Sequence, residues 1–168
     1  MTEALSLFAS ALAGRPVPLE TTPRDAGCSD GSTIYLPATL EPGSVTARHL
    51  VICLAALQRS GTYRKDVLRK LNRGTAEVCR RYLLLEVWRS CTRLEPMLPR
   101  SFLAALHDAV GDIRPSESAD ESLKRAKSTE KLPSAPDWMG ELVPSTILSA
   151  GNALADNASP DDSDSAEV

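Results

Sequence analysis

Residues 74–94 read GTAEVCRRYLLLEVWRSCTRL and carry the longest run of strong helical periodicity in the chain. Apolar side chains recur in this run at helical separations and cover more than half of a helix circumference. They are Val78, Cys79, Tyr82, Leu83, Leu85, Val87 and Trp88. The remaining polar stripe holds Glu77, Arg80 and Arg81, and Thr75 is suited to cap the first turn. This pattern predicts a core helix with one solvent-exposed edge.

Other segments repeat the helical pattern on both sides of this run. Amphipathic helices are predicted at 2–13, 45–59, 63–71 and 101–110, and glycine or proline separates each from its neighbour. Ser118 and Glu121 have the spacing of a capping box, which predicts a short surface helix from 121 to 127. The apolar residues of 132–149 are too numerous for a simple linker. We therefore expect that segment to dock on the helices or on a partner.

Two short extended segments, 17–20 and 32–36, lie between the first two predicted helices. They predict a small two-stranded ribbon within about 16–37. The fold class is therefore mainly α, a compact helical domain with this ribbon near the N-terminus and a disordered acidic C-terminal tail. The expected organisation is a helical domain at 1–112, a polar linker with short docking helices at 113–150, and the tail at 151–168.

Charge is unevenly distributed along this chain of 168 residues, whose net charge is −3. The stretch 64–100 holds ten basic residues against four acidic ones. From residue 116 onward, eleven acidic residues face four basic ones. The two halves could attract each other, or the basic half could meet an acidic partner.

Several kinds of site and location are not predicted. The four cysteines form no CxxC pair and both histidines are distant from them in sequence, which argues against a zinc site. Residues 161–165 spell D-x-S-x-S, but no apolar strand precedes them, so a solvated tail is favoured over a metal site. The spacing of Ser101 and His107 does not suit a catalytic triad. We expect no catalytic, cofactor or metal residues and no enzymatic activity.

The sequence shows no features of an N-terminal secretory signal and no apolar run of the ~20 residues that a membrane span requires. We therefore expect a cytoplasmic protein without a membrane span, in which the cysteines stay reduced. No glycine-rich phosphate loop with a following lysine is present, which argues against ATP binding by this chain.

The first candidate site is the pair Glu86 and Arg89, one turn apart on the central predicted helix. A buried carboxylate there must be paired or protonated, because an uncompensated buried charge is costly. The pair could organise an assembly as a structural ion pair, or it could be a simple salt bridge at the edge of the helix.

The second candidate is a basic face at 64–73, formed by Arg64, Lys65, Arg69, Lys70 and Arg73. It could bind an acidic protein, follow nucleic-acid phosphates, or remain a solvated surface. Tyr63, Tyr82 and Trp88 are the nearby aromatic residues, but the last two belong to the predicted core pattern. No known nucleic-acid-binding signature is present. A solvated surface is the favoured interpretation of this stretch taken alone. Among the binding roles, a protein partner is favoured, and a small nucleic-acid-binding protein is the alternative.

Three stretches together resemble a known family. They are SDGSTIYLP at 29–37, LEVWR at 85–89, and DESLKRA at 120–126 followed by PDWMG at 136–140. This combination is similar to the N-terminal region of the NorD/CbbO family, von Willebrand factor A proteins that act with MoxR-type AAA+ ATPases. The family often has a His-Gln-x-x-His pair where this chain has Leu57-Gln58-Arg59-Ser60, so no role of those histidines transfers.

The family's metal-binding A domain would begin about where this sequence stops, so the resemblance covers a helical module without that domain. It implies a non-catalytic interaction module of an activator system, of the kind that serves nitric-oxide reductase or Rubisco. The implied partners are a MoxR-type AAA+ ATPase, a von Willebrand A-domain protein, or both. Homo-oligomerisation is also possible.

Overall fold

The structure is a computed structural model that describes residues 2–157, with side chains for residues 3–152. It confirms a mainly helical fold with a small sheet near the N-terminus. The elements in order are α1 (Thr2–Ala13), β1 (Leu19–Thr22), β2 (Cys28–Ser29), β3 (Ile34–Pro37), α2 (Val45–Arg59), α3 (Lys65–Asn72), α4 (Ala76–Arg93), η1 (Glu95–Met97), α5 (Arg100–Val110), α6 (Ala119–Lys127), η2 (Asp137–Met139) and α7 (Pro144–Asn157).

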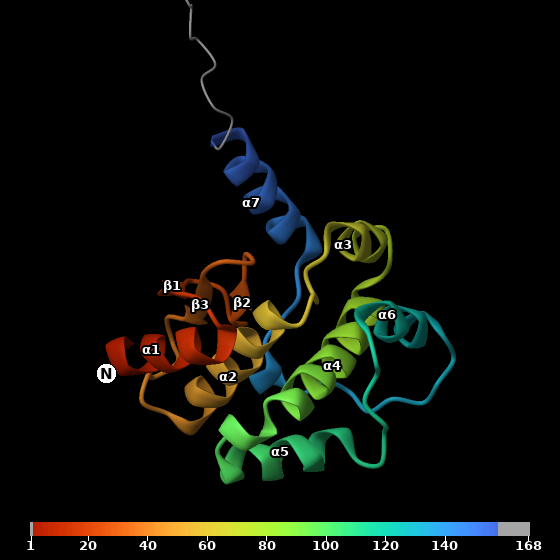
Figure 1. The fold of residues 1–168 in the computed structure, drawn as a ribbon, viewed down its shortest axis with the longest axis horizontal. Helices are drawn as coiled ribbons and strands as arrows, with labels where there is room; N and C mark the ends of the chain where they lie inside the picture. Colours follow the sequence, from red (N-terminus) through yellow and green to blue (C-terminus); the bar gives the residue numbers. More distant parts are fainter. Residues whose placement is uncertain (1, 158–168) are drawn as a thin grey trace, which may run out of the picture.

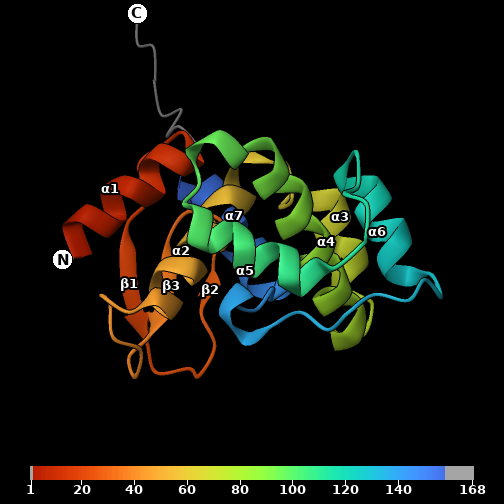
Figure 2. The same ribbon diagram turned by 90° about the horizontal axis from the view of Figure 1, so that it is seen from below.

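Helix α2 lies between two groups of elements (Figure 1). The sheet and α1 lie on one side of it, and α3, α4 and α6 lie on the other, in both views of the ribbon (Figures 1 and 2). Helix α5 lies across one end of α4, and α7 packs on α3. None of the described helices is both long enough and apolar enough to cross a lipid bilayer.

The small sheet has three strands, where the sequence predicted two. Their order is β1-β3-β2, with β1 parallel and β2 antiparallel to β3. Strand β2 is only two residues long, so no alternating pattern marks it in the sequence. Pairing of β1 begins after Pro18, because proline has no amide hydrogen to donate to the sheet. The Pro18 carbonyl still accepts a hydrogen bond from the Ile34 amide.

Side-chain caps fix the start of several helices. Ser44, Thr75 and Ser118 each accept a hydrogen bond from a backbone amide in the first turn of α2, α4 and α6. The Thr75 cap sets the start of α4, as the sequence predicts, and the spacing of Ser118 and Glu121 likewise marks the start of α6. Helix α6 is not only a surface helix, because Ser122 and Ala126 are buried.

One hydrophobic core runs through the described residues, and its largest fully buried side chains come mainly from α2, α3, α4 and α5. Segment 132–149 packs on this core. Met139 in η2 is fully buried, and Leu142 and Ile147 are buried beyond it. Docking of this segment was one of the two expected outcomes.

The predicted tail at 151–168 falls partly outside the described residues. Helix α7 continues past residue 151 to Asn157. Residues 158–168, which include the D-x-S-x-S spelling at 161–165, lie outside the described part of the chain. The cysteines, which all lie within the described residues, are free thiols.

His49 couples stability to pH. Its ring contacts the edges of Phe102 and Trp138, with centroids 5.3 and 5.5 Å away. Burial lowers the pKa of His49, and the neighbouring Arg48 lowers it further. The unfolded chain therefore binds more protons than the folded chain. This contribution to stability is fully present above the unfolded pKa of about 6.5 and is lost as pH falls through the folded value.

We expect the urea midpoint of the wild-type chain to fall more between about pH 7 and pH 5 than that of His49→Gln, which does not titrate in this range. Urea unfolding followed by circular dichroism at several pH values measures the difference. Parallel pH profiles for the two proteins would show that His49 does not carry this dependence.

Candidate functional site

The carboxylate of Glu86 lies at the centre of a buried polar cluster. The Arg89 guanidinium donates from Nε to Oε2 at 2.6 Å and from Nη2 to Oε1 at 2.7 Å. The Thr62 hydroxyl donates to Oε1 at 2.9 Å, and the Ser122 hydroxyl donates to Oε2 at 2.8 Å. Glu86, Thr62 and Ser122 have no exposed surface, and Arg89 is 3% exposed. We call these four residues the Glu86 cluster.

The Glu86 cluster joins three parts of the chain. Thr62 comes from the turn between α2 and α3, Glu86 and Arg89 from α4, and Ser122 from α6. Arg89 also donates to the Ser60 carbonyl at 2.5 Å, and the Tyr82 hydroxyl donates to the Thr62 carbonyl at 2.7 Å. The hydrogen bonds from the Arg89 side chain to Glu86 raise the pKa of Arg89, so the guanidinium stays charged despite its burial. The pair is therefore central to the fold and does not lie at a helix edge.

A second set of arginines holds α6 against α4. Arg81 donates to the carbonyls of Arg125, Ala126, Ser128 and Glu130, at distances from 2.7 to 3.3 Å. The last carbonyls of a helix lack partners within it, so Arg81 satisfies the C-terminus of α6. This finding corrects the prediction that Arg81 belongs to a solvent-exposed stripe, because that side chain is half-buried.

Arg125 is the other buried cation of this region and is 7% exposed. Its guanidinium forms two hydrogen bonds with the Glu130 carboxylate, at 2.9 and 3.0 Å, and also donates to the Ser116 hydroxyl and the Arg114 carbonyl. These contacts brace the segments on both sides of α6. Its burial could not be inferred from the sequence, because the surrounding residues are polar.

The basic face divides into two parts in the structure. All five predicted residues are exposed, but Arg64 forms ion pairs with Asp66 at 2.6 Å and with Asp120 at 2.9 Å. The hydrogen bonds that Arg64 donates to Asp66, followed by those that it donates to Asp120, raise the pKa of Arg64. Arg64 therefore links the start of α3 to α6 and is engaged within the chain.

The other four cations form what we call the α3 edge. Lys65, Arg69 and Lys70 lie on α3, and Arg73 follows directly as its C-cap residue. Within the described residues, none of the four forms an ion pair or a side-chain hydrogen bond. The opposite face of α3 is buried through Val67, Leu68 and Leu71. Packing of that face fixes the helix while its cations stay in solvent.

Two of the three aromatic residues near the α3 edge, Tyr82 and Trp88, are not available to stack on bases. Tyr82 is fully buried, and its hydroxyl is occupied by the Thr62 carbonyl. Trp88 is half-buried and donates from Nε1 to the Ile113 carbonyl at 2.8 Å. Single-stranded nucleic acids are usually held by exposed aromatic rings together with basic side chains. Tyr63 lies beside the basic side chains but is itself half-buried.

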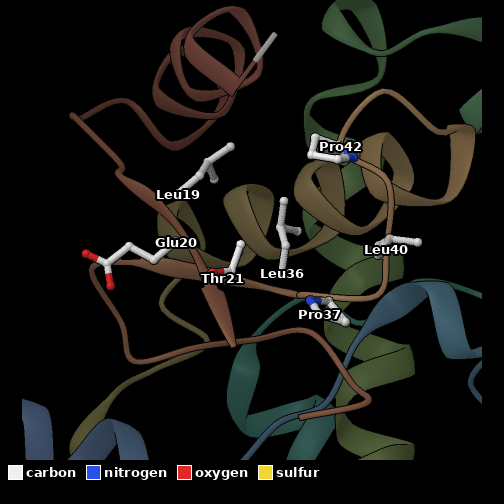
Figure 3. A pocket seen from close by; sticks show the side chains of 7 residues that line it. All are labelled: Leu19, Glu20, Thr21, Leu36, Pro37, Leu40 and Pro42. Carbon is white, nitrogen blue, oxygen red and sulfur yellow. The ribbon is translucent and has the colours of Figure 1, made fainter. Parts of the chain in front are cut away.

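A hollow of about 460 Å³ opens between β1, β3 and the loop that leads to α2 (Figure 3). Its lining is mostly apolar and includes Leu19, Leu36 and Leu40, and Glu20 is its one ionisable residue. Glu20 has no cation or second titratable group beside it in this lining, and the Thr21 hydroxyl is the one other side-chain group there that could react. Among the described residues, no three His, Cys, Asp or Glu side chains gather as a metal site would require.

The stretches behind the family resemblance are brought together only in part. Residues 29–37 comprise the end of β2, the following turn and β3, and in that turn the Asp30 carboxylate accepts hydrogen bonds from Ser32, Thr33 and Tyr35. Residues 85–89 and 120–126 meet directly, because Ser122 donates to Glu86. Comparison with known protein families, curated proteins and solved structures found no match. The resemblance therefore remains an expectation.

Sequence reasoning identified Glu86 and Arg89 but missed both of their hydroxyl partners. Thr62 follows a Ser-Gly break and carries no signal of its own in the sequence. Ser122 has one weak signal, because a serine one position after the capping-box glutamate lies on the inward face of a short amphipathic helix. Neither position could be assigned to a carboxylate 24 or 36 residues away without the tertiary structure.

Proposed function

We propose that this chain is a non-catalytic protein-interaction module that uses the α3 edge to bind an acidic surface of a partner protein. The observation that supports the proposal most strongly is the set of four exposed cations without partners in the described chain, fixed on a helix whose other face is buried. Cations held on a rigid element attract an acidic surface without a large ordering cost. The family resemblance implies that the partner is a MoxR-type AAA+ ATPase, a von Willebrand A-domain protein, or both, in a cytoplasmic activator system.

The Glu86 cluster has a supporting role in this proposal. It joins the turn before α3 to α4 and α6, and Arg64 adds an ion pair from the first residue before α3 to Asp120 in α6. These contacts set the position of the α3 edge relative to the body of the molecule. Glu86 and Arg89 therefore act as a structural ion pair that positions the edge without touching the partner.

Neutralising the α3 edge tests the proposal. We expect the variant Lys65→Gln/Arg69→Gln/Lys70→Gln/Arg73→Gln to bind a purified MoxR-type ATPase or A-domain protein of the same genome on the order of tenfold more weakly at physiological salt. The four side chains are exposed, so the unfolding free energy should change by only about 0.5 kcal/mol for each substitution. Biolayer interferometry measures the affinity, and thermal unfolding checks the fold.

The matched control removes four exposed cations elsewhere, in Arg100→Gln/Lys124→Gln/Lys127→Gln/Lys131→Gln. It changes net charge by the same amount and should retain most of the affinity. Equal losses in both variants would mean that net charge matters and the α3 edge does not. Failure of the wild-type chain to bind either protein, together with tight and salt-sensitive retention of DNA or RNA on filters, would favour the nucleic-acid alternative.

A further inference from the structure

The first half of helix α7 lies close to the start of the α3 edge. It packs directly on α3, and Lys65 reaches toward Gly151 of α7. The described chain ends at Asn157, at the end of α7. The first residue after it therefore starts from a helix that is already held against the basic one.

The sequence that follows is complementary in charge to the α3 edge. Residues 158–168 contain Asp161, Asp162, Asp164 and Glu167 and no basic residue. Four carboxylates thus follow a helix that packs on α3, and the α3 edge holds four cations without partners in the described chain. Opposite charges attract across a surface even when no single pair is fixed in one geometry.

The length of this segment is sufficient for the contact. Eleven residues, 158–168, reach at most about 40 Å when extended. Helix α3 has 8 residues, which corresponds to a length of about 12 Å. The segment can therefore return along α7 and still reach Arg73 at the far end of the edge.

We propose that residues 158–168 dock on the α3 edge of the same chain and compete there with an acidic partner. The competition rests on the function proposed above, whereas the docking itself does not. Each exposed ion pair is weak and is screened by salt, so the contact is reversible. The short tether compensates for the weakness, because it holds the segment at a local concentration of about millimolar.

Zero-length crosslinking tests the docking directly. Carbodiimide joins carboxylates to lysine amines, and the chain has only five lysines, Lys65, Lys70, Lys124, Lys127 and Lys131. In the monomer of residues 1–168 at low salt, we expect peptides containing 161–167 to be joined mainly to Lys65 and Lys70, as read by mass spectrometry. These products should fall at least about fivefold at 0.5 M salt, where charge interactions are screened within a few Å.

Lys124, Lys127 and Lys131 are exposed lysines outside α3 and provide the internal control. Crosslinks spread evenly over all five lysines, or no monomeric crosslink to Lys65 and Lys70, would overturn the docking. The second variant for this test is Arg69→Gln/Arg73→Gln, which keeps both reactive lysines but halves the charge of the edge. It should lower the yield at Lys65 and Lys70, and an unchanged yield would contradict the proposal.

Competition is measured with a fluorescein-labelled octaglutamate peptide as the acidic probe. We expect the full-length variant Asp161→Asn/Asp162→Asn/Asp164→Asn/Glu167→Gln to bind the probe about three- to tenfold more tightly than the wild type at low salt. The two should converge at 0.5 M salt. Equal affinity at low salt would overturn the competition while leaving the proposed function intact.

The two proposals can fail separately. Crosslinks to Lys65 and Lys70 in a chain that binds no ATPase or A-domain partner, even with the neutral segment, would sustain the docking and reject the proposed function. Partner binding that depends on the α3 edge, without those crosslinks, would support the proposed function and reject the docking.

Discussion

Replacing Glu86 with alanine should lower the unfolding free energy by about 3–5 kcal/mol, because the substitution leaves Arg89 as an uncompensated buried charge. For a domain of this size, that loss corresponds to a decrease in melting temperature on the order of 10 °C. The hydroxyls of Thr62 and Ser122 would also lose their acceptor. Chemical and thermal unfolding followed by circular dichroism measures the effect.

Glu77→Ala is the matched control on the same helix. Its carboxylate lies 3.5 Å from Arg80, and both side chains are mostly exposed. Removing that surface pair should cost about 0.5 kcal/mol or less. The double variant Glu86→Leu/Arg89→Met should recover part of the loss, because it removes both buried charges. A melting temperature for Glu86→Ala equal to that of Glu77→Ala would reject the structural role of the pair.

Substitution of Gly140 by alanine should cost about 3–5 kcal/mol, through backbone strain together with a steric clash. Gly140 has a φ of 82° and ψ of −160°, a conformation that side chains rarely tolerate. An added Cβ would lie 2.8 Å from both the Gly27 carbonyl oxygen and a methyl carbon of Leu50. Relief of the clash would disturb the bond from the Glu141 amide to that carbonyl, at 2.8 Å.

The variant Gly111→Ala separates the cost of backbone strain from the cost of the steric clash. Gly111 also has a positive φ, of 63°, but an added Cβ would meet nothing within 4 Å. Its substitution should cost only the strain, about 1–3 kcal/mol. Urea unfolding of both variants compares them. Equal losses would mean that the close approach of Gly140 to Gly27 and Leu50 does not help to fix segment 132–143 on the core.

Local patterns were sufficient to predict α1 to α6, but they did not predict α7, which runs into the predicted tail, or most of the contacts between helices. The apolar repeat of 74–94 and the Thr75 cap predict α4 because both are properties of neighbouring residues. Strand β2 was missed because two residues cannot show a period, and its pairing with β3 depends on a turn held by Asp30. The hydroxyl partners of Glu86, Thr62 and Ser122, were also missed, because they lie 24 and 36 residues away along the sequence.

The position of a charge on a helix did not reveal whether it is exposed. Arg80 and Arg81 are neighbours on the predicted polar stripe, yet Arg80 is exposed and Arg81 caps α6. Arg64 and Lys65 differ similarly, because Arg64 is paired with Asp120. In each case the difference comes from where α6 packs, and that packing is set by buried contacts far along the chain. The basic character of 64–73 was evident from the sequence, but its division into paired and free cations was not.

Hydrogen–deuterium exchange of residues 1–168, alone and with a saturating MoxR-type ATPase or A-domain protein, tests the central claim most directly. An interface covers the backbone it contacts, and α3 is a short helix with an exposed face, so its amides should respond to a bound partner. We expect added protection in peptides that span 62–76, with little change in α5. Protection confined to other elements, or no change at any saturating concentration, would contradict it.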